Sequence, residues 1–269
     1  MSGKTYTQEQ ILSGIRIFWR ETLGCDSPID PEMSMIEQLK SVGLYEDLDF
    51  TDVCVGLQRL FGFISYWEEW DAFLGIPIKD PDEWEKTVAP RLTFRALAEF
   101  IREQLKLISF EPITLLGKPC LTAGVFRGIE RLAVQVYPRV RRFAPSTPIH
   151  QCLRGVRCYL FWNRLRWMVH DELPPLATIR FNSRGFLHSL SFKVAIGVMI
   201  ALWTRDLNGF LGGIVVTLSL LLPMGWLAAL INWWWNPLPE GIETFGDLAR
   251  VLAAIILDQQ SECASCSTP

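Results

Sequence analysis

LYEDLDFTDVCVGLQRLF, residues 44–61, predicts a short turn followed by an amphipathic helix. Its apolar residues recur at steps of three and four, which places them on one side of a helix: Phe50, Val53, Leu57, Leu60 and Phe61. Asp47 or Asp49 stands at the entry, where a carboxylate oxygen can accept hydrogen bonds from the free amides of the first turn. Gly62 follows as a natural end of the helix.

This helix resembles the second helix of an acyl carrier protein. The family pattern is Asp-Ser-Leu-Asp, an apolar helix, then Glu-Glu-Phe-Gly. Here Glu46-Asp47-Leu48-Asp49 and Arg59-Leu60-Phe61-Gly62 occupy the two motifs with no gap between them. The resemblance covers about residues 5–106 and implies a small helical bundle; an unrelated helical bundle is the alternative.

One position departs from the family pattern. In the family, the serine of the first motif carries a phosphopantetheine arm, and Asp47 stands at that position here. A carboxylate cannot form the phosphodiester in the same reaction. The resemblance therefore implies a carrier-like domain, residues 1–106, that holds no cofactor.

Residues 62–92 form a longer link than the family uses, and they combine tryptophans with acidic residues. One interpretation is a partner-docking surface in which Trp67 and Trp70 are aromatic anchors, with Asp49 and Asp52 on the preceding helix as further candidates. The other is a local lid whose tryptophans complete the core.

Composition points to a membrane. The hydrophobic fraction is 49%, mean hydropathy is +0.20, and 11 tryptophans are present, a residue enriched at membrane interfaces. Residues 1–111 hold 20 acidic and 11 basic residues, whereas residues 112–193 hold 13 basic and 3 acidic ones. An acidic front and a basic middle fit a domain followed by a membrane-proximal segment. The N-terminus has no signal-peptide pattern, and 7 scattered cysteines favour a reducing compartment.

Residues 107–185 form a basic, amphipathic, membrane-proximal region, with a helix expected from about Val125 to before Tyr137. Residues 149–169 predict a further helix, rich in arginine and aromatic residues. Its candidates for contact with an anionic membrane surface are Arg154, Arg157, Arg164 and Trp167. An ordinary packed helix is an equal alternative. Nucleic-acid binding is disfavoured, because an apolar hairpin follows.

Residues 186–236 predict a transmembrane helical hairpin. Its second arm, residues 209–235, carries no charge and is long enough to span a bilayer. The first arm contains Lys193 and is a weaker span. Basic residues before the hairpin place its ends, and the N-terminal domain, in the cytoplasm. A buried hairpin in a soluble protein is the alternative.

Residues 237–269 predict a short helix and a disordered tail. The stretch from Thr244 to Leu252 echoes the capped helix from Thr93 to Ile101, as a relic of a second carrier-like unit or as a simple amphipathic helix. Cys263 and Cys266 have redox or metal spacing, but no second pair accompanies them. No metal site is expected.

The sequence therefore predicts an all-α protein without phosphate, dinucleotide or nucleophile motifs. We expect a non-catalytic adaptor at the cytoplasmic face of the inner membrane, with the lipid bilayer and enzymes of acyl or lipid metabolism as partners. One alternative is a membrane-tethered acyl carrier that uses another hydroxyl. The other is an enzyme or transporter component that uses acid and base groups at residues 170–172.

Overall fold

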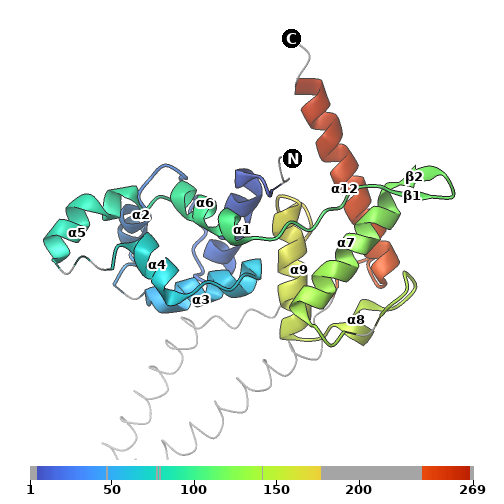
Figure 1. Ribbon diagram of the computed structural model, residues 1–269, viewed down its shortest axis with the longest axis horizontal. Helices are drawn as coiled ribbons and strands as arrows, with labels where there is room; N and C mark the ends of the chain where they lie inside the picture. Colours follow the sequence, from blue (N-terminus) through green and yellow to red (C-terminus); the bar gives the residue numbers. More distant parts are fainter. Residues whose placement is uncertain are drawn as a thin grey trace, which may run out of the picture. The chain divides into compact units, whose positions relative to one another are not determined.

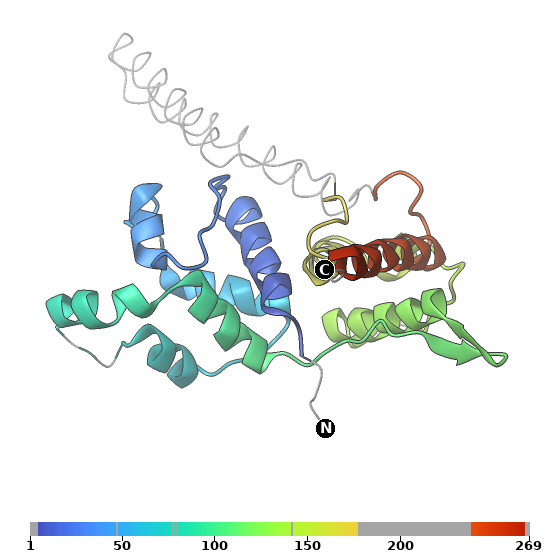
Figure 2. The same cartoon turned by 90° about the horizontal axis from the view of Figure 1, so that it is seen from above.

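The computed structural model describes residues 5–46, 48–76, 78, 80–140, 142–176 and 238–266. This part of the chain is mainly helical and includes one two-stranded sheet (Figures 1 and 2). Apart from the first residue of one helix, Val156, its helices belong to one compact unit built from residues 1–153, 157–175 and 239–269.

The predicted transmembrane hairpin, residues 186–236, lies outside the described residues, as does Asp47. Within the part that the structure describes, no helix is both long and apolar enough to cross a membrane.

The N-terminal half contains four main helices, α1 (Gln8–Glu21), α2 (Met35–Ser41), α3 (Phe50–Phe61) and α6 (Phe94–Gln104). Between α3 and α6 lie α4 (Trp67–Leu74), α5 (Pro81–Thr87) and the short 3-10 helix η1 (Ala89–Arg91). Helix α1 packs against both α3 and α6. The apolar stripe of α6 faces this core: Phe94, Leu97, Ala98 and Ile101 are all buried.

Side-chain caps set the start of these helices. Thr7 and Gln10 form a reciprocal capping box at the start of α1. The Asp49 carboxylate accepts a hydrogen bond from the Thr51 amide at 2.7 Å and caps α3. Gly62 ends α3 with a φ of 79°, in the left-handed region that glycine adopts without steric cost.

In the C-terminal half, the described residues form a β-hairpin and four helices. The antiparallel strands β1 (Ile113–Leu115) and β2 (Lys118–Cys120) lead into α7 (Leu121–Val136). Helices α8 (Ile149–Cys152), α9 (Val156–Met168) and α12 (Phe245–Cys266) follow.

Three boundaries differ from the sequence prediction. Helix α7 starts four residues before Val125, although it ends before Tyr137 as expected. The single helix expected over residues 149–169 is broken into α8 and α9 at Gly155, which has a φ of 57°. Helix α12 continues to Cys266, so most of the tail predicted to be disordered is helical.

The two halves are closed by the same kind of backbone pairing. Ser34, just before α2, forms an isolated antiparallel bridge with Thr93, just before α6. Pro148, just before α8, forms the same bridge with Thr244, just before α12. The surrounding hydrogen bonds repeat in register: Met35 N to Leu92 O (2.7 Å) matches Ile149 N to Glu243 O (3.0 Å), and Arg95 N to Pro31 O (2.9 Å) matches Gly246 N to Pro145 O (2.7 Å).

The residues that fill the two cores also correspond. With one constant offset, the buried residues of α1, α2 and the loop between them fall on buried residues of the second half: Ile11 on Val125, Ile15 on Ile129, Phe18 on Leu132, Ile29 on Phe143 and Leu39 on Leu153. Helix α7 packs on α12 as α1 packs on α6 (Figure 2). The chain therefore repeats one arrangement, in which α1, α2 and α6 correspond to α7, α8 and α12. We call α1, α2, α3 and α6 the first repeat, and α7, α8, α9 and α12 the second repeat.

Candidate functional site

The acidic start of α3 is accessible. Asp49 and Asp52 are both exposed, and Asp49 also caps the helix. A helix N-terminus favours such negative charge, so the cap explains Asp49 without a partner. Asp52 lies in the first turn of α3, where the helix N-terminus also favours its charge, but it caps no amide and stays a docking candidate.

A second accessible surface lies at the other end of α3, and we call it the Tyr66 patch: Ile64 (88% exposed), Tyr66 (73%), Trp67 (50%) and Glu68. Glu69 fixes this turn, since its carboxylate accepts hydrogen bonds from the Tyr66 amide and the Ser65 hydroxyl. Twelve residues of α3 separate this patch from Asp49, so the structure does not join the two. Sequence reasoning found Trp67 but missed Ile64 and Tyr66, which stand just before the α4 helix.

Trp70 is not part of any accessible surface. It is 1% exposed, and its ring contacts those of Phe63, Phe73 and Phe100. Residue 70 lies one turn into α4, on the side that faces the first-repeat core. The prediction of Trp70 as a docking anchor is thereby corrected in favour of the core interpretation.

Helix α9 is likewise more buried than its arginines suggest. Arg164 is 7% exposed and Trp167 is fully buried, so neither side chain meets a membrane surface in this structure. Arg164 donates hydrogen bonds to the carbonyls of Leu60 (3.1 Å) and Arg59 (2.9 Å) at the end of α3. Burial lowers the pKa of its guanidinium to about 10. Trp167 packs against the rings of Tyr6 and Phe61.

The other two membrane-surface candidates are accessible. Arg154 and Arg157 are exposed, and the Arg157 guanidinium lies over the Tyr137 ring, 3.8 Å from its centre. A cation over an aromatic face is a stabilising contact in its own right.

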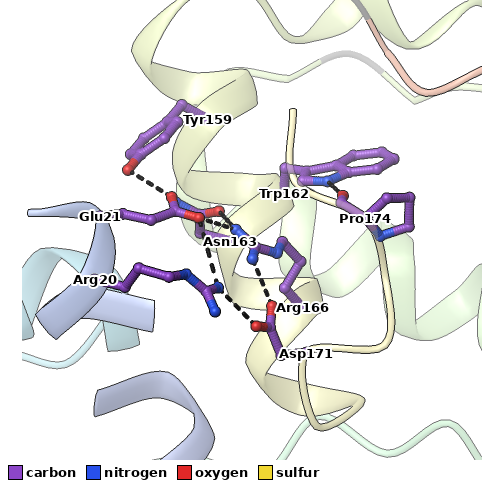
Figure 3. A network of polar contacts seen from close by, with 8 residues as sticks. All are labelled: Arg20, Glu21, Tyr159, Trp162, Asn163, Arg166, Asp171 and Pro174. Atoms are coloured by element: carbon purple, nitrogen blue, oxygen red, sulfur yellow. Dashed lines mark hydrogen bonds and ion pairs between the residues drawn. The ribbon is translucent and has the colours of Figure 1, made fainter. Parts of the chain in front are cut away.

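A polar network joins the repeats at the end of α1 (Figure 3). Arg166 of α9 is 1% exposed and pairs with Glu21 of α1, and also with Asp171 at 2.5 Å. Arg20 reaches the other Asp171 oxygen at 2.7 Å. The Tyr159 hydroxyl donates to Glu21 at 3.2 Å, and burial raises the pKa of Tyr159 to about 12.

This network holds an unusual turn after α9. His170 and Asp171 have φ values of 55° and 64°, which residues other than glycine seldom adopt. The two arginines on the Asp171 carboxylate and the hydrogen bond from the Asp171 amide to Arg166 O (2.8 Å) hold that conformation. The turn thereby sets the positions of His170 and Glu172, the acid and base groups singled out from the sequence.

His170 and Glu172 line a pocket of about 820 Å³, which we call the His170 pocket. Four segments form its wall: residues 5–10 at the N-terminus, residues 107–112 between the repeats, the turn after α9, and residues 256–260 of α12. Sequence reasoning could not find it, because its walls come from positions more than a hundred residues apart.

Thiols and clustered metal-ligating side chains are the groups of the described residues on which reactive chemistry would depend. Burial raises the pKa of the thiols of Cys54 and Cys158 to about 12, so neither is an activated nucleophile. In the ranges that the structure describes, no three His, Cys, Asp or Glu side chains gather as a metal site. The side chains of Cys263 and Cys266 fall outside the described part. Comparison of the chain with protein-family models, curated proteins and solved structures finds no match.

Proposed function

We propose that the chain is a membrane-anchored, non-catalytic adaptor that docks proteins of acyl or lipid metabolism at the cytoplasmic face of the inner membrane. The observation that carries the proposal is the Tyr66 patch, where three large apolar side chains are at least half exposed. Exposed apolar side chains that lie together mark interaction sites. The uncharged stretch at residues 209–235 supplies the anchor.

The helical order of the first repeat supports a carrier-like module that has lost the carrier reaction. Asp47 replaces the hydroxyl on which the arm would be built. The interior of this repeat holds a cavity of only about 40 Å³, which admits little more than one water molecule. A protein surface, and not a stored acyl chain, is therefore the ligand we propose.

The partner should present apolar and basic side chains. The Tyr66 patch offers aromatic area next to the carboxylate of Glu68, and residues 1–111 carry 20 acidic against 11 basic residues. Opposite charge on a partner speeds encounter and fixes orientation, while the buried aromatic contacts supply most of the affinity.

A photo-crosslinking amino acid at position 66 of the full chain tests the proposal, with position 116 as the control. Leu116 is fully exposed but lies on the β1–β2 turn. We expect crosslinks from position 66 to a defined enzyme of acyl or lipid metabolism, and none from position 116. With that enzyme purified, Trp67→Asp should weaken binding at least tenfold. Equal crosslinking from both positions, or binding that Trp67→Asp does not change, would overturn the proposal.

Intact mass of the chain purified from membranes separates this adaptor from a working carrier. The unmodified mass is expected. A gain equal to phosphopantetheine would show that another hydroxyl carries the arm.

A further inference from the structure

We propose that Arg139, Arg142 and Arg157 form a surface that binds the anionic head groups of phospholipids in the bilayer that holds the chain. We call this surface the arginine face. The proposal rests on the membrane anchor proposed above and adds the class of lipid that the chain selects. The arginine face shares no residue with the Tyr66 patch, so lipid binding and protein docking are separate properties.

Two helices bring the three arginines to one region, and all three side chains are exposed. The Arg157 guanidinium, at the start of α9, lies over the ring of Tyr137, which directly follows α7. Arg139 and Arg142 lie two and five residues beyond Tyr137. Chain length therefore keeps their Cα atoms within about 7 Å and about 18 Å of the Tyr137 Cα atom. Phe143, the residue after Arg142, is buried and fixes this segment to the core of the second repeat.

The positive charge of the arginine face is not neutralised by the described residues. In the part of the chain that the structure describes, no carboxylate forms an ion pair with any of the three arginines. Residues 177–237, which lie outside that part, carry four basic residues and one acidic residue: Arg180, Arg184, Lys193, Arg205 and Asp206. By sequence they add positive charge, and the one exposed carboxylate at Glu240 does not reverse the balance.

The chain enters and leaves the predicted hairpin next to the helices that carry the arginine face. On the outgoing side, Pro174 O accepts a hydrogen bond from the Trp162 indole at 2.7 Å. Trp162 follows Arg157 by five residues, which is about 8 Å along the axis of α9. On the returning side, Glu243 O accepts a hydrogen bond from the Ile149 amide at the start of α8. A chain anchored through the hairpin thus has lipid head groups near the arginine face.

The chemistry of arginine selects the phosphate of an anionic lipid. A guanidinium group forms paired hydrogen bonds with phosphate oxygens and keeps its charge at every physiological pH. Anionic lipids give the cytoplasmic surface of a bilayer a negative potential, and each arginine close to that surface strengthens binding about fivefold. The half-buried Tyr137 adds an aromatic ring of the kind that favours the membrane interface.

Two short-chain lipids that differ in head-group charge test the proposal: dioctanoyl phosphatidylglycerol, an anion, and dioctanoyl phosphatidylcholine, which has no net charge. Native mass spectrometry of the full chain in a maltoside detergent measures the Kd of each. We expect the anionic lipid to bind at least fivefold more tightly, and we expect this preference to fall as ionic strength rises. An excess of inorganic phosphate or of a DNA duplex should not displace the bound lipid.

A triple variant, Arg139→Gln, Arg142→Gln and Arg157→Gln, should bind the two lipids equally. The corresponding triple replacement by lysine keeps the charge and should retain the preference, which separates attraction to the head group from a role of the arginines in folding. Thermal unfolding of each variant verifies that it folds.

A charge-matched control removes three exposed cations from the N-terminal half: Arg59→Gln, Lys86→Gln and Arg91→Gln. This variant loses the same net charge and should keep the preference for the anionic lipid. Equal affinity of the unchanged chain for both lipids would refute the proposal, as would a preference that survives the glutamine variant or is lost equally in the control. Displacement of the lipid by phosphate or by DNA would assign the arginine face to a soluble anion or to nucleic acid instead.

Failure of this proposal is distinguishable from failure of the proposed function. Cell fractionation tests the anchor, and crosslinking from position 66 tests the adaptor, whereas the two lipid affinities test the arginine face alone.

Discussion

At the scale of single residues, a buried arginine, Arg164, contributes to the contact between the repeats. Arg164 donates to two carbonyls at the end of α3, groups that a helix C-terminus leaves without partners. The approach is close, because a Cβ added at Gly62 would lie 2.4 Å from the Arg164 guanidinium carbon. Glycine at this position therefore ends α3 and also makes room for the second repeat.

Gly62→Ala should destabilise the protein by about 2–5 kcal/mol, the sum of a left-handed backbone cost and an overpacking cost. Gly43→Ala separates the two terms, since Gly43 has a φ of 69° with no atom within 4 Å of an added Cβ. We expect only about 1–2 kcal/mol there. Urea unfolding measures both, and equal losses would show that the Arg164 contact yields at no cost.

Buried thiols give a prediction for chemical reactivity. The pKa of Cys54 and Cys158 is raised from 9.0 to about 12 by burial, so at pH 8.5 both should resist iodoacetamide in the folded chain. Cys120 is half-buried and should react. Peptide mass spectrometry before and after urea unfolding gives the rate at which iodoacetamide alkylates each cysteine.

The same shift predicts the pH dependence of stability. Between pH 9 and 12 the unfolded chain releases these two protons and the folded chain retains them. The free energy of unfolding contributed by these thiols should therefore fall as the pH rises above 9. A double Cys54→Ala, Cys158→Ala variant should show a shallower fall, and an identical slope would contradict the assignment.

At the scale of elements, sequence patterns located most helices but not their surroundings. The caps at Thr7, Asp49 and Thr93 were predictable, because capping is a local interaction between residues two or three apart. The burial of α9 was not predictable. Arg164, Arg166 and Trp167 are enclosed by residues from distant helices, and an arginine in a sequence carries no mark of a partner a hundred residues away.

The same limit applied to the candidate sites. The acid and base groups at residues 170–172 were visible in the sequence, whereas the pocket beside them required α12 and the segment between the repeats. Trp67 and Trp70 looked alike in the sequence, and only the packing of α4 separates the exposed ring from the buried one.

The ion pair between α1 and α9 should be strongly stabilising in context. Arg166→Met leaves the Glu21 and Asp171 carboxylates without their buried partner, and we expect a loss of about 3–5 kcal/mol. Lys40→Met removes an ion pair with Glu85 in which both side chains are largely exposed, and should cost far less stability, because solvent screens such a pair. Denaturant unfolding measures the free energy of unfolding of both variants against that of the unchanged chain. Similar losses in both variants would mean that the network is not a link between the repeats.

At the scale of the whole molecule, two repeats share one closing pattern. In the first, residues 62–92 connect α3 to α6; in the second, the corresponding connection runs from residue 169 to residue 243 and includes the stretch predicted to form the hairpin. Helix α7 packs on α12, and α9 contacts the first repeat through Arg164 and Arg166. None of these contacts involves the stretch predicted to form the hairpin.

Replacing residues 177–237 with a flexible Gly/Ser linker should therefore preserve the described helices. We expect helical circular dichroism and a cooperative thermal transition, and we expect the shortened chain in the supernatant after cell fractionation while the full chain sediments with membranes. A full chain found in the supernatant would contradict the proposed anchor. Loss of the thermal transition would contradict the independence of the helical unit.

A backbone bridge joins the segments before α2 and α6, and the same bridge joins the segments before α8 and α12. The connection that leads into the last helix of each repeat, α6 or α12, should therefore accept an insertion. A few backbone hydrogen bonds at fixed positions close each repeat. The entropic cost of closing a longer loop rises by only about 0.6 kcal/mol for each doubling of its length. A reporter domain or a new recognition loop could thus be spliced into this connection at little thermodynamic expense. Such tolerance would let a duplicated module diversify its two copies along separate evolutionary routes while conserving a single scaffold.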